Sequence, residues 1–67
     1  GAEQIVRDLV GKYLADPASL PKPYDERAAS LDRPERAALI RDFVAGQTDR
    51  YAISEHRRLF PSTPELR

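Results

Sequence analysis

Most of the chemistry in this sequence lies in four consecutive residues, Thr48, Asp49, Arg50 and Tyr51. They follow Gly46, where a helix is expected to bend or stop, so nearby backbone amides become available to an anion. An arginine at such a bend can hold a phosphate through two hydrogen bonds, and a tyrosine offers a hydroxyl and a stacking face for a nucleoside. The simpler alternative is structural: a threonine and an aspartate that cap a helix, an arginine that pairs locally and a tyrosine in the core.

The single histidine, His56, lies between Glu55 and Arg57 on what we expect to be an exposed, highly charged helix. One histidine without any cysteine cannot complete a tetrahedral zinc site, so a surface or interface role is the better prediction. The basic residues around it suit either an anionic ligand or the carboxyl end of a helix. The sequence contains no Ser/His/Asp trio, no phosphate-binding glycine loop and no His–Asp pair, so we expect no catalytic and no metal-binding residues within it.

The charges of the chain balance, with eleven basic and eleven acidic side chains. Proteins that bind nucleic acid by neutralising phosphates carry a basic excess, and the adjacent Ala45 and Gly46 do not fit helix-turn-helix spacing, so we expect no nucleic acid partner. No apolar run approaches the ~20 residues that span a bilayer, and no signal-peptide pattern is present. Together with the lack of cysteine, these features predict a cytoplasmic protein that does not bind membranes.

Hydrophobic periodicity predicts an all-α fold within a single segment, 1–67. A first helix is expected over about 3–15, because apolar residues recur there at helical spacing: Ile5, Val6, Leu9, Val10, Tyr13 and Leu14. The Asp16-Pro17 pair ends this helix, since the residue before a proline avoids the helical region. Further prolines predict a Pro-rich loop that is extended over 20–23, with a helical turn over 25–30 as an option. After this loop, Asp32 can cap a second, antiparallel helix that begins at about residue 33.

Gly46 and Thr48 leave two possibilities for the second half of the chain. The preferred prediction is one long, kinked helix over about 33–53, followed by a short helix over about 54–60 that is capped by Ser54. In the alternative, the helix ends near Gly46, and Thr48 caps a new helix that begins at the next residue. Two prolines favour a frayed tail over 61–67.

Several stretches resemble the C-terminal region of the deoxyguanosinetriphosphate triphosphohydrolase family, within the HD-domain superfamily of metal-dependent phosphohydrolases. The resemblance rests on Tyr13-Leu14-Ala15-Asp16-Pro17 with Leu20-Pro21, on Asp42-Phe43-Val44-Ala45-Gly46 through Thr48-Asp49-Arg50-Tyr51-Ala52, and on Glu55-His56-Arg57-Arg58-Leu59-Phe60. It departs from the usual run at Gln47, where the family commonly has methionine, and mildly at Phe43, where it has tyrosine.

Membership implies an enzyme that hydrolyses a deoxynucleoside triphosphate to the deoxynucleoside and inorganic triphosphate. A divalent metal ion, held by histidines and aspartates upstream, would activate water for attack on the α-phosphorus. Those ligands are not in this sequence, so the resemblance implies a C-terminal fragment that is inert alone, holds no cofactor, and has the remainder of the parent enzyme as its partner. It further implies which residues come nearest to the nucleotide: Thr48, Asp49, Arg50 and Tyr51.

A chain of this length forms at most a marginal core without a disulfide or a metal ion. Its apolar helix faces therefore predict self-association, for example as a dimer of helical hairpins. The alternative from another class is a free-standing helical module that docks its apolar stripe on a partner protein. A long natural reading frame with upstream histidine–aspartate helices would favour the enzyme, and a short one would favour the module.

Overall fold

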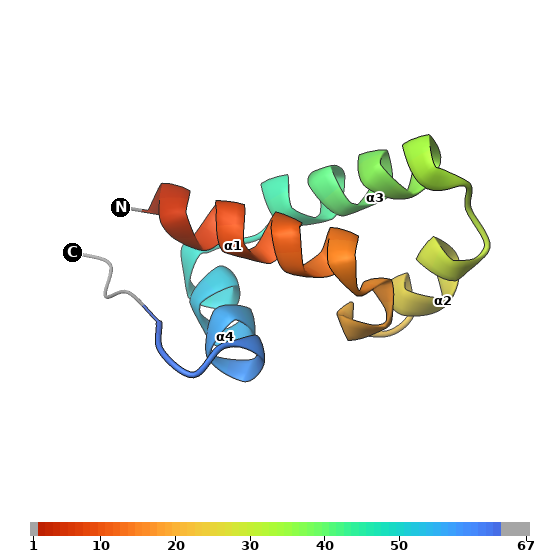
Figure 1. The fold of residues 1–67 in the computed structure, drawn as a ribbon. Helices are drawn as coiled ribbons and strands as arrows, with labels where there is room; N and C mark the ends of the chain where they lie inside the picture. Colours follow the sequence, from red (N-terminus) through yellow and green to blue (C-terminus); the bar gives the residue numbers. More distant parts are fainter. Residues whose placement is uncertain (1, 64–67) are drawn as a thin grey trace.

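The computed structural model describes residues 2–63, in which every regular element is helical. The elements are α1 (Ala2–Ala15), the short 3-10 helix η1 (Pro17–Ser19), α2 (Tyr24–Ala29), α3 (Arg33–Ala45) and α4 (Asp49–Leu59). Helices α1 and α3 lie side by side and run in opposite directions, while α4 packs on α1 from below in this view (Figure 1). The predicted all-α fold is therefore confirmed, and so is its antiparallel pair of helices.

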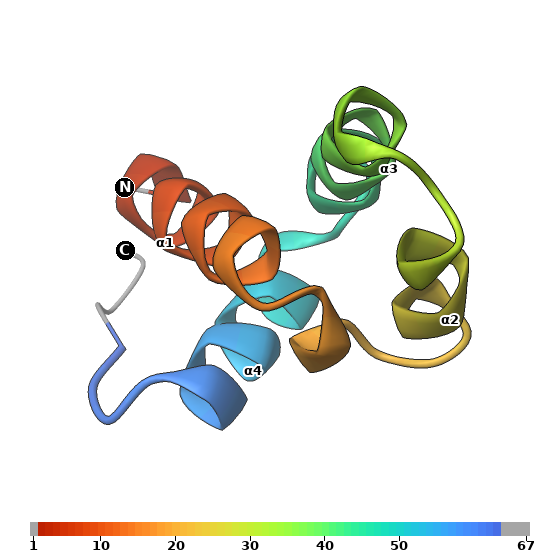
Figure 2. The ribbon, with the colours of Figure 1, turned by 45° about the vertical axis from the view of Figure 1, so that its right-hand side comes forward.

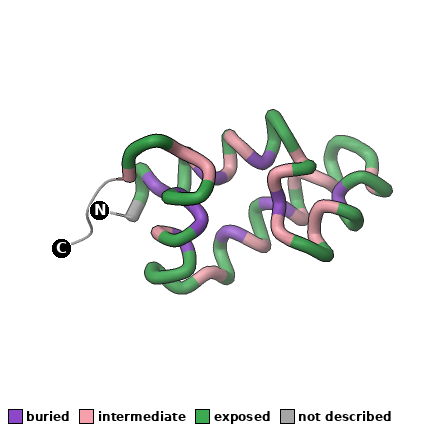
Figure 3. The backbone as a smooth tube through the Cα atoms, turned by 90° about the horizontal axis from the view of Figure 1, so that it is seen from below, coloured by how far each residue is buried: buried purple, intermediate pink, exposed green. Residues whose placement is uncertain are grey.

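Helix α1 is central because both α3 and α4 pack against it. Figure 2, which looks nearly along the axis of α1, shows these two helices on different sides of it. Its residues Ile5, Leu9 and Tyr13 follow one another at one-turn intervals and are fully buried. In contrast, Val6 and Leu14 are 40% and 41% exposed, so the buried stripe of α1 is narrower than the sequence predicted. Buried positions lie on the helix faces that turn inward (Figure 3), and the other elements contribute Leu20, Ala28, Ile40, Val44 and Ala52 to the core.

Helix α3 begins as predicted. The Asp32 side chain accepts a hydrogen bond from the Glu35 amide at 3.1 Å, which satisfies one of the unpaired amides of the first turn. Arg36 then reaches back and donates to the carbonyls of Ala28 and Leu31, both at 2.9 Å. Because carbonyls at the end of a helix lack partners within that helix, these bonds fasten the end of α2 to the start of α3.

The chain breaks between α3 and α4, so the preferred prediction of one helix over 33–53 is wrong. Thr48 has an extended backbone with ψ of 160°, and its Oγ1 accepts a hydrogen bond from the Tyr51 amide at 3.1 Å. In an uninterrupted helix that amide would bond to the carbonyl of Gln47, so the threonine side chain replaces the helical ladder and starts a new helix. The alternative prediction, in which Thr48 caps a helix from Asp49, is the correct one.

The predicted short helix over 54–60 is also wrong, because Ser54 lies in the middle of α4 rather than at its start. The break before α4 lets this helix turn back onto α1 and bury Ala52, which a straight continuation of α3 would not do. After α4, residues 61–63 contain no helix. Of the tail predicted over 61–67, the last four residues lie outside the described part of the chain.

Candidate functional site

The four residues singled out at the α3–α4 junction line two different surfaces of this segment. Thr48 and Tyr51 line an aromatic cleft of about 460 Å3, whereas Asp49 and Arg50 line a separate hollow of about 450 Å3. Successive residues of a helix point about 100° apart, which is enough to divide the first turn of α4 between two surfaces. The hydroxyl oxygen of Thr48 already accepts the Tyr51 amide, so its observed role is to cap the helix.

The aromatic cleft lies where α2, α3 and α4 approach one another, and Phe43 is at its centre. The Phe43 ring centroid lies 4.5 Å from that of Tyr24 and 6.2 Å from that of Tyr51, which meets it edge-on at 89°. Tyr51 is 41% exposed, so part of this aromatic surface is open to a ligand or a partner. The full lining is Tyr24, Leu39, Asp42, Phe43, Gly46, Gln47, Thr48 and Tyr51.

Gln47 adds an amide group to a cleft that is lined mainly by aromatic and aliphatic side chains, with Asp42 and Thr48 at its polar positions. Its Nε2 and Oε1 atoms are both buried, and neither has a hydrogen-bond partner among residues 2–63. The Gln47 amide lies near enough to the Tyr13 hydroxyl to lower the pKa of that phenol, but the hydroxyl donates to Glu55 at 2.6 Å and no hydrogen bond of standard geometry joins it to Gln47. A buried polar group without a partner costs about 1–3 kcal/mol, so the Gln47 amide lowers the stability of the isolated segment.

The second hollow lies along α4 and is predominantly basic. Its two arginines, Arg50 and Arg57, are exposed, and neither forms an ion pair within the described part of the chain. Residues seven apart share one side of a helix, so the two guanidinium groups can act on the same phosphate or carboxylate. The lining is Asp49, Arg50, Ile53, Ser54 and Arg57.

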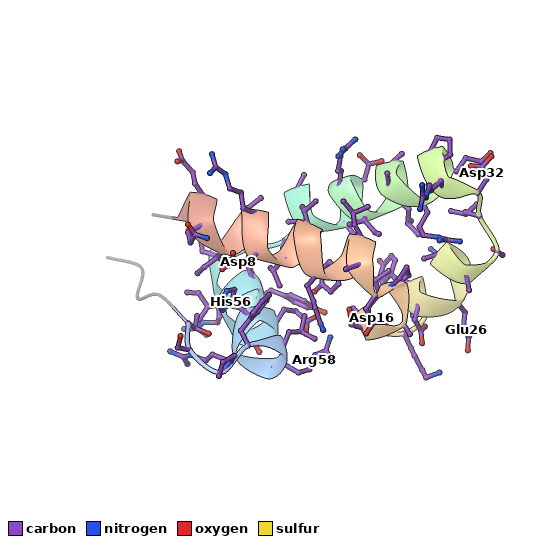
Figure 4. The ribbon with its side chains drawn as sticks, in the orientation of Figure 1. Asp8, Asp16, Glu26, Asp32, His56 and Arg58 are labelled. Atoms are coloured by element: carbon purple, nitrogen blue, oxygen red, sulfur yellow. The ribbon has the colours of Figure 1, made fainter. Side chains whose placement is uncertain are left out.

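The prediction of an exposed His56 is wrong, because this residue is only 2% exposed. Its Nε2 lies 2.8 Å from Oδ2 of Asp8 on α1, and its Nδ1 lies 2.8 Å from Oγ1 of Thr63 (Figure 4). The ring also stacks on Phe60 with 4.3 Å between centroids. An ionised carboxylate can only accept, so Nε2 carries the hydrogen, and this hydrogen bond from His56 lowers the pKa of Asp8.

Asp8, His56 and Thr63 supply the carboxylate, imidazole and hydroxyl types that hydrolytic triads use, a combination that the sequence alone did not reveal. The imidazole, however, is only 2% exposed and is stacked on Phe60, so it is not presented to a substrate. The observed function of the group is to hold α1, α4 and the segment after α4 together. Forty-eight residues separate the aspartate from the histidine, so no local sequence signal could have paired them.

A second polar cluster joins α1, η1 and α4 around buried Glu55. This carboxylate accepts the Tyr13 hydroxyl at 2.6 Å and both Nε and Nη2 of Arg58 at 2.9 Å, while Nη2 also donates to the Ser19 carbonyl at 2.7 Å. The hydrogen bond from Arg58 lowers the pKa of Glu55. Burial, followed by the hydrogen bond to Glu55, raises the pKa of Tyr13, so at neutral pH the phenol keeps its hydrogen and the carboxylate stays ionised.

The described residues do not fit a metal site of the histidine–aspartate kind. Within 2–63, no three His, Cys, Asp or Glu side chains are grouped so that they could hold an ion. His56, the only histidine, is bonded to Asp8 and Thr63 instead.

In the same part of the chain, no helix combines the length and the apolar character needed to cross a bilayer.

Comparison with known proteins adds a family to this geometry. The model of the phosphohydrolase-associated domain matches residues 1–58. A deoxyguanosinetriphosphate triphosphohydrolase-like protein of Nitrobacter hamburgensis is 59% identical over 98% of this chain and 17% of its own length. Similarly named proteins of Mesorhizobium japonicum and Rhizobium etli are 54% and 51% identical, over 98% and 100% of this chain and 16% and 17% of their own lengths. No solved structure matches the chain.

The chain thus spans only about 17% of the length of the curated relatives that it matches. The match to the family model nevertheless includes the aromatic cleft, the basic hollow and the cluster around Glu55. It also agrees with the resemblance that the sequence motifs predicted. This chain therefore belongs to the phosphohydrolase-associated domain family.

Proposed function

We propose that this chain is the C-terminal helical part of a metal-dependent deoxynucleoside triphosphate triphosphohydrolase. The observation that carries the proposal is the similarity of 98% of the chain to a protein named as triphosphohydrolase-like, of which it spans only 17%. In the parent reaction, water adds to the α-phosphorus and the 5′ oxygen leaves with the deoxynucleoside, which releases inorganic triphosphate. The reaction needs groups that the described residues do not supply.

Within the parent, the segment would complete the helical shell around the active site and would be inert on its own. The divalent metal ion would be held by the remainder of the parent, because residues 2–63 offer no group of ligands for it. What the segment offers instead is a firm attachment of α4 to α1 through buried Glu55 and His56. A helix held in this way can present a side chain to a site built elsewhere.

We propose that Arg50, with Asp49 beside it, comes nearest to the phosphates of the nucleotide. Support comes from the exposure of Arg50, from its lack of an ion pair among the described residues and from Arg57 on the same hollow. Thr48 and Tyr51 lie on the cleft side of the same helical turn, so we propose that they lie next to the nucleotide site without facing it.

Replacement of Arg50 in the full-length parent tests this assignment. Arg50→Ala should lower kcat/KM for the deoxynucleotide roughly tenfold or more, because hydrogen bonds to a charged group contribute about 1.5–3 kcal/mol. The matched control is Arg41→Ala, which removes an exposed arginine of α3 that does not line the hollow. Equal kinetics for the two variants, with metal content and folding unchanged, would contradict the role of Arg50.

A free-standing interaction module is the second candidate, and the exposed aromatic surface at Tyr51 favours it. The intact mass of the natural gene product separates the two functions. A product several times larger than this chain supports the enzyme, whereas one of about this size supports the module. For the 67-residue chain alone we expect self-association through its apolar faces, and a concentration-independent monomer in sedimentation would contradict it.

A further inference from the structure

We infer that the aromatic cleft is the surface on which an amphipathic helix from the remainder of the parent chain packs. The inference rests on the proposed function, in which such a remainder exists, and adds the place of contact. Tyr51 is 41% exposed, and Leu39 and Phe43 are only partly buried although they pack against the core. Half-buried aromatic and aliphatic side chains around one cleft suit the apolar stripe of a helix.

The amide of Gln47 specifies one feature of that helix. Both of its polar atoms are buried without a partner among the described residues, although Gln47 lines the cleft. A helix cannot satisfy them with its own backbone, whose groups are already bonded to each other. Since neither atom exposes surface to the outside, the packed helix reaches them only if the Gln47 side chain turns toward it on docking, and it should then carry a hydrogen-bonding side chain, such as serine, threonine or asparagine, within its apolar stripe.

The charge at the edge of the cleft specifies another feature. Asp42 is exposed, lines the cleft and forms no ion pair within 2–63, and no lysine or arginine is among the lining residues. A lysine or arginine beside the apolar stripe of the incoming helix would complement this carboxylate.

Length favours a helix of the same chain over a second copy. The relatives extend over about six times the length of this segment, since it covers 16–17% of them. A helix that is covalently tied to the segment meets the cleft at a far higher effective concentration than a separate molecule does.

Site-specific cross-linking of the full-length protein tests the inference. A photoreactive amino acid replaces Asp42 at the edge of the cleft or, as the matched control, its exposed neighbour Arg41, which does not line the cleft. We expect cross-links from position 42, several-fold more abundant than from position 41, to a helix that precedes this segment in the same molecule. Mixing isotopically labelled and unlabelled protein distinguishes links within one molecule from links between two.

Links from position 42 that join only two different molecules, or a yield no greater than that from position 41, would overturn the inference. Once the linked helix is known, its predicted cation supplies a second measurement. Asp42→Lys should lower Tm, and reversing that cation to glutamate in the same protein should restore it. An assay of triphosphate release by the unmodified protein is separate: its failure would remove the proposed reaction but leave the contact at the cleft intact.

Discussion

The two sides of α4 differ in how completely their polar groups are paired. Toward α1, buried Glu55 and His56 have partners on every side, including Tyr13, Arg58 and Asp8. Toward α2 and α3, the buried amide of Gln47, in the linker just before α4, has none among the described residues, and Tyr51 on the first turn of α4 remains 41% exposed. The buried polar groups on the α1 side of the helix are therefore all paired. On the other side a buried amide is unpaired and an aromatic side chain is partly exposed, as expected of a surface that packs against a further element.

This difference indicates that α4 serves two purposes. Its paired side stabilises the segment, because buried charges contribute to stability only when their hydrogen bonds are satisfied. Its unpaired side lowers the stability of the isolated segment, because the buried Gln47 amide has no hydrogen-bond partner among the described residues. Substitutions on the two sides should consequently have opposite effects.

The largest effect is expected at Glu55. Glu55→Ala removes the acceptor of Tyr13 and Arg58 at once and should lower the free energy of unfolding by about 2–3 kcal/mol. Urea denaturation measures the change, with Glu26→Ala as the control, because Glu26 has a 72% exposed side chain and only a surface ion pair. A loss no larger than that of the control would show that the paired side contributes no stability.

Lowering the pH should gradually reduce the stability that the paired side of α4 contributes. Hydrogen bonds from His56 and Arg58 respectively lower the pKa of Asp8 and of Glu55 in the folded state, so the unfolded chain binds protons first as the pH falls. Their contribution is complete above about pH 5 and is lost as the pH drops through the lowered folded pKa values. Tm measured between about pH 6 and pH 2 should therefore fall. The double variant Asp8→Asn, Glu55→Gln should flatten that dependence; an unchanged slope would be contrary to it.

Replacing Gln47 should raise the stability of the isolated segment instead of lowering it. In the 67-residue chain, Gln47→Met removes two unsatisfied buried atoms and should raise the free energy of unfolding by about 1–2 kcal/mol. In the full-length parent, where we infer that a helix supplies hydrogen bonds, the same substitution should lower Tm. Thermal melts of both proteins make the comparison, with Arg7→Met at an exposed position of α1 as the control. The same sign in both proteins would show that nothing pairs with Gln47 in the parent.

The smallest effect concerns the boundary that creates the cleft. Thr48→Ala removes the acceptor of the Tyr51 amide and should cost about 1 kcal/mol. Ser54→Ala, at the position predicted to cap a separate helix, should change stability by no more than about 0.5 kcal/mol because Ser54 is an exposed residue within α4. Chemical denaturation measures the free energy of unfolding of the two variants. Equal losses of this free energy would mean that Thr48 does not fix the start of α4.

Local chemistry accounts for what could be predicted of the fold. Asp32 and the Asp16-Pro17 pair act on amides and backbone angles within a few residues, so the start of α3 and the end of α1 could be predicted. The boundary at Thr48 could not be decided locally, because glycine and threonine are compatible with both a bend and a break. Packing of α4 on α1 settled the choice.

The candidate site divides in the same way. The sequence singled out the turn with Arg50 and Tyr51, and its motifs indicated the family that the comparisons show. It could not show that these neighbours line different surfaces, nor that His56 is buried, because its partner Asp8 is 48 residues away.

By itself, then, the sequence determined the helical class, both ends of α1, the start of α3 and the family, since periodicity, caps and motifs act over a few residues. Only the tertiary structure decided which polar groups are paired. Hydrogen bonds between α1 and α4 depend on a juxtaposition that exists once the helices have packed. The same packing left Gln47 without a hydrogen-bond partner among the described residues, so buried polar groups are paired on one side of α4 and unpaired on the other.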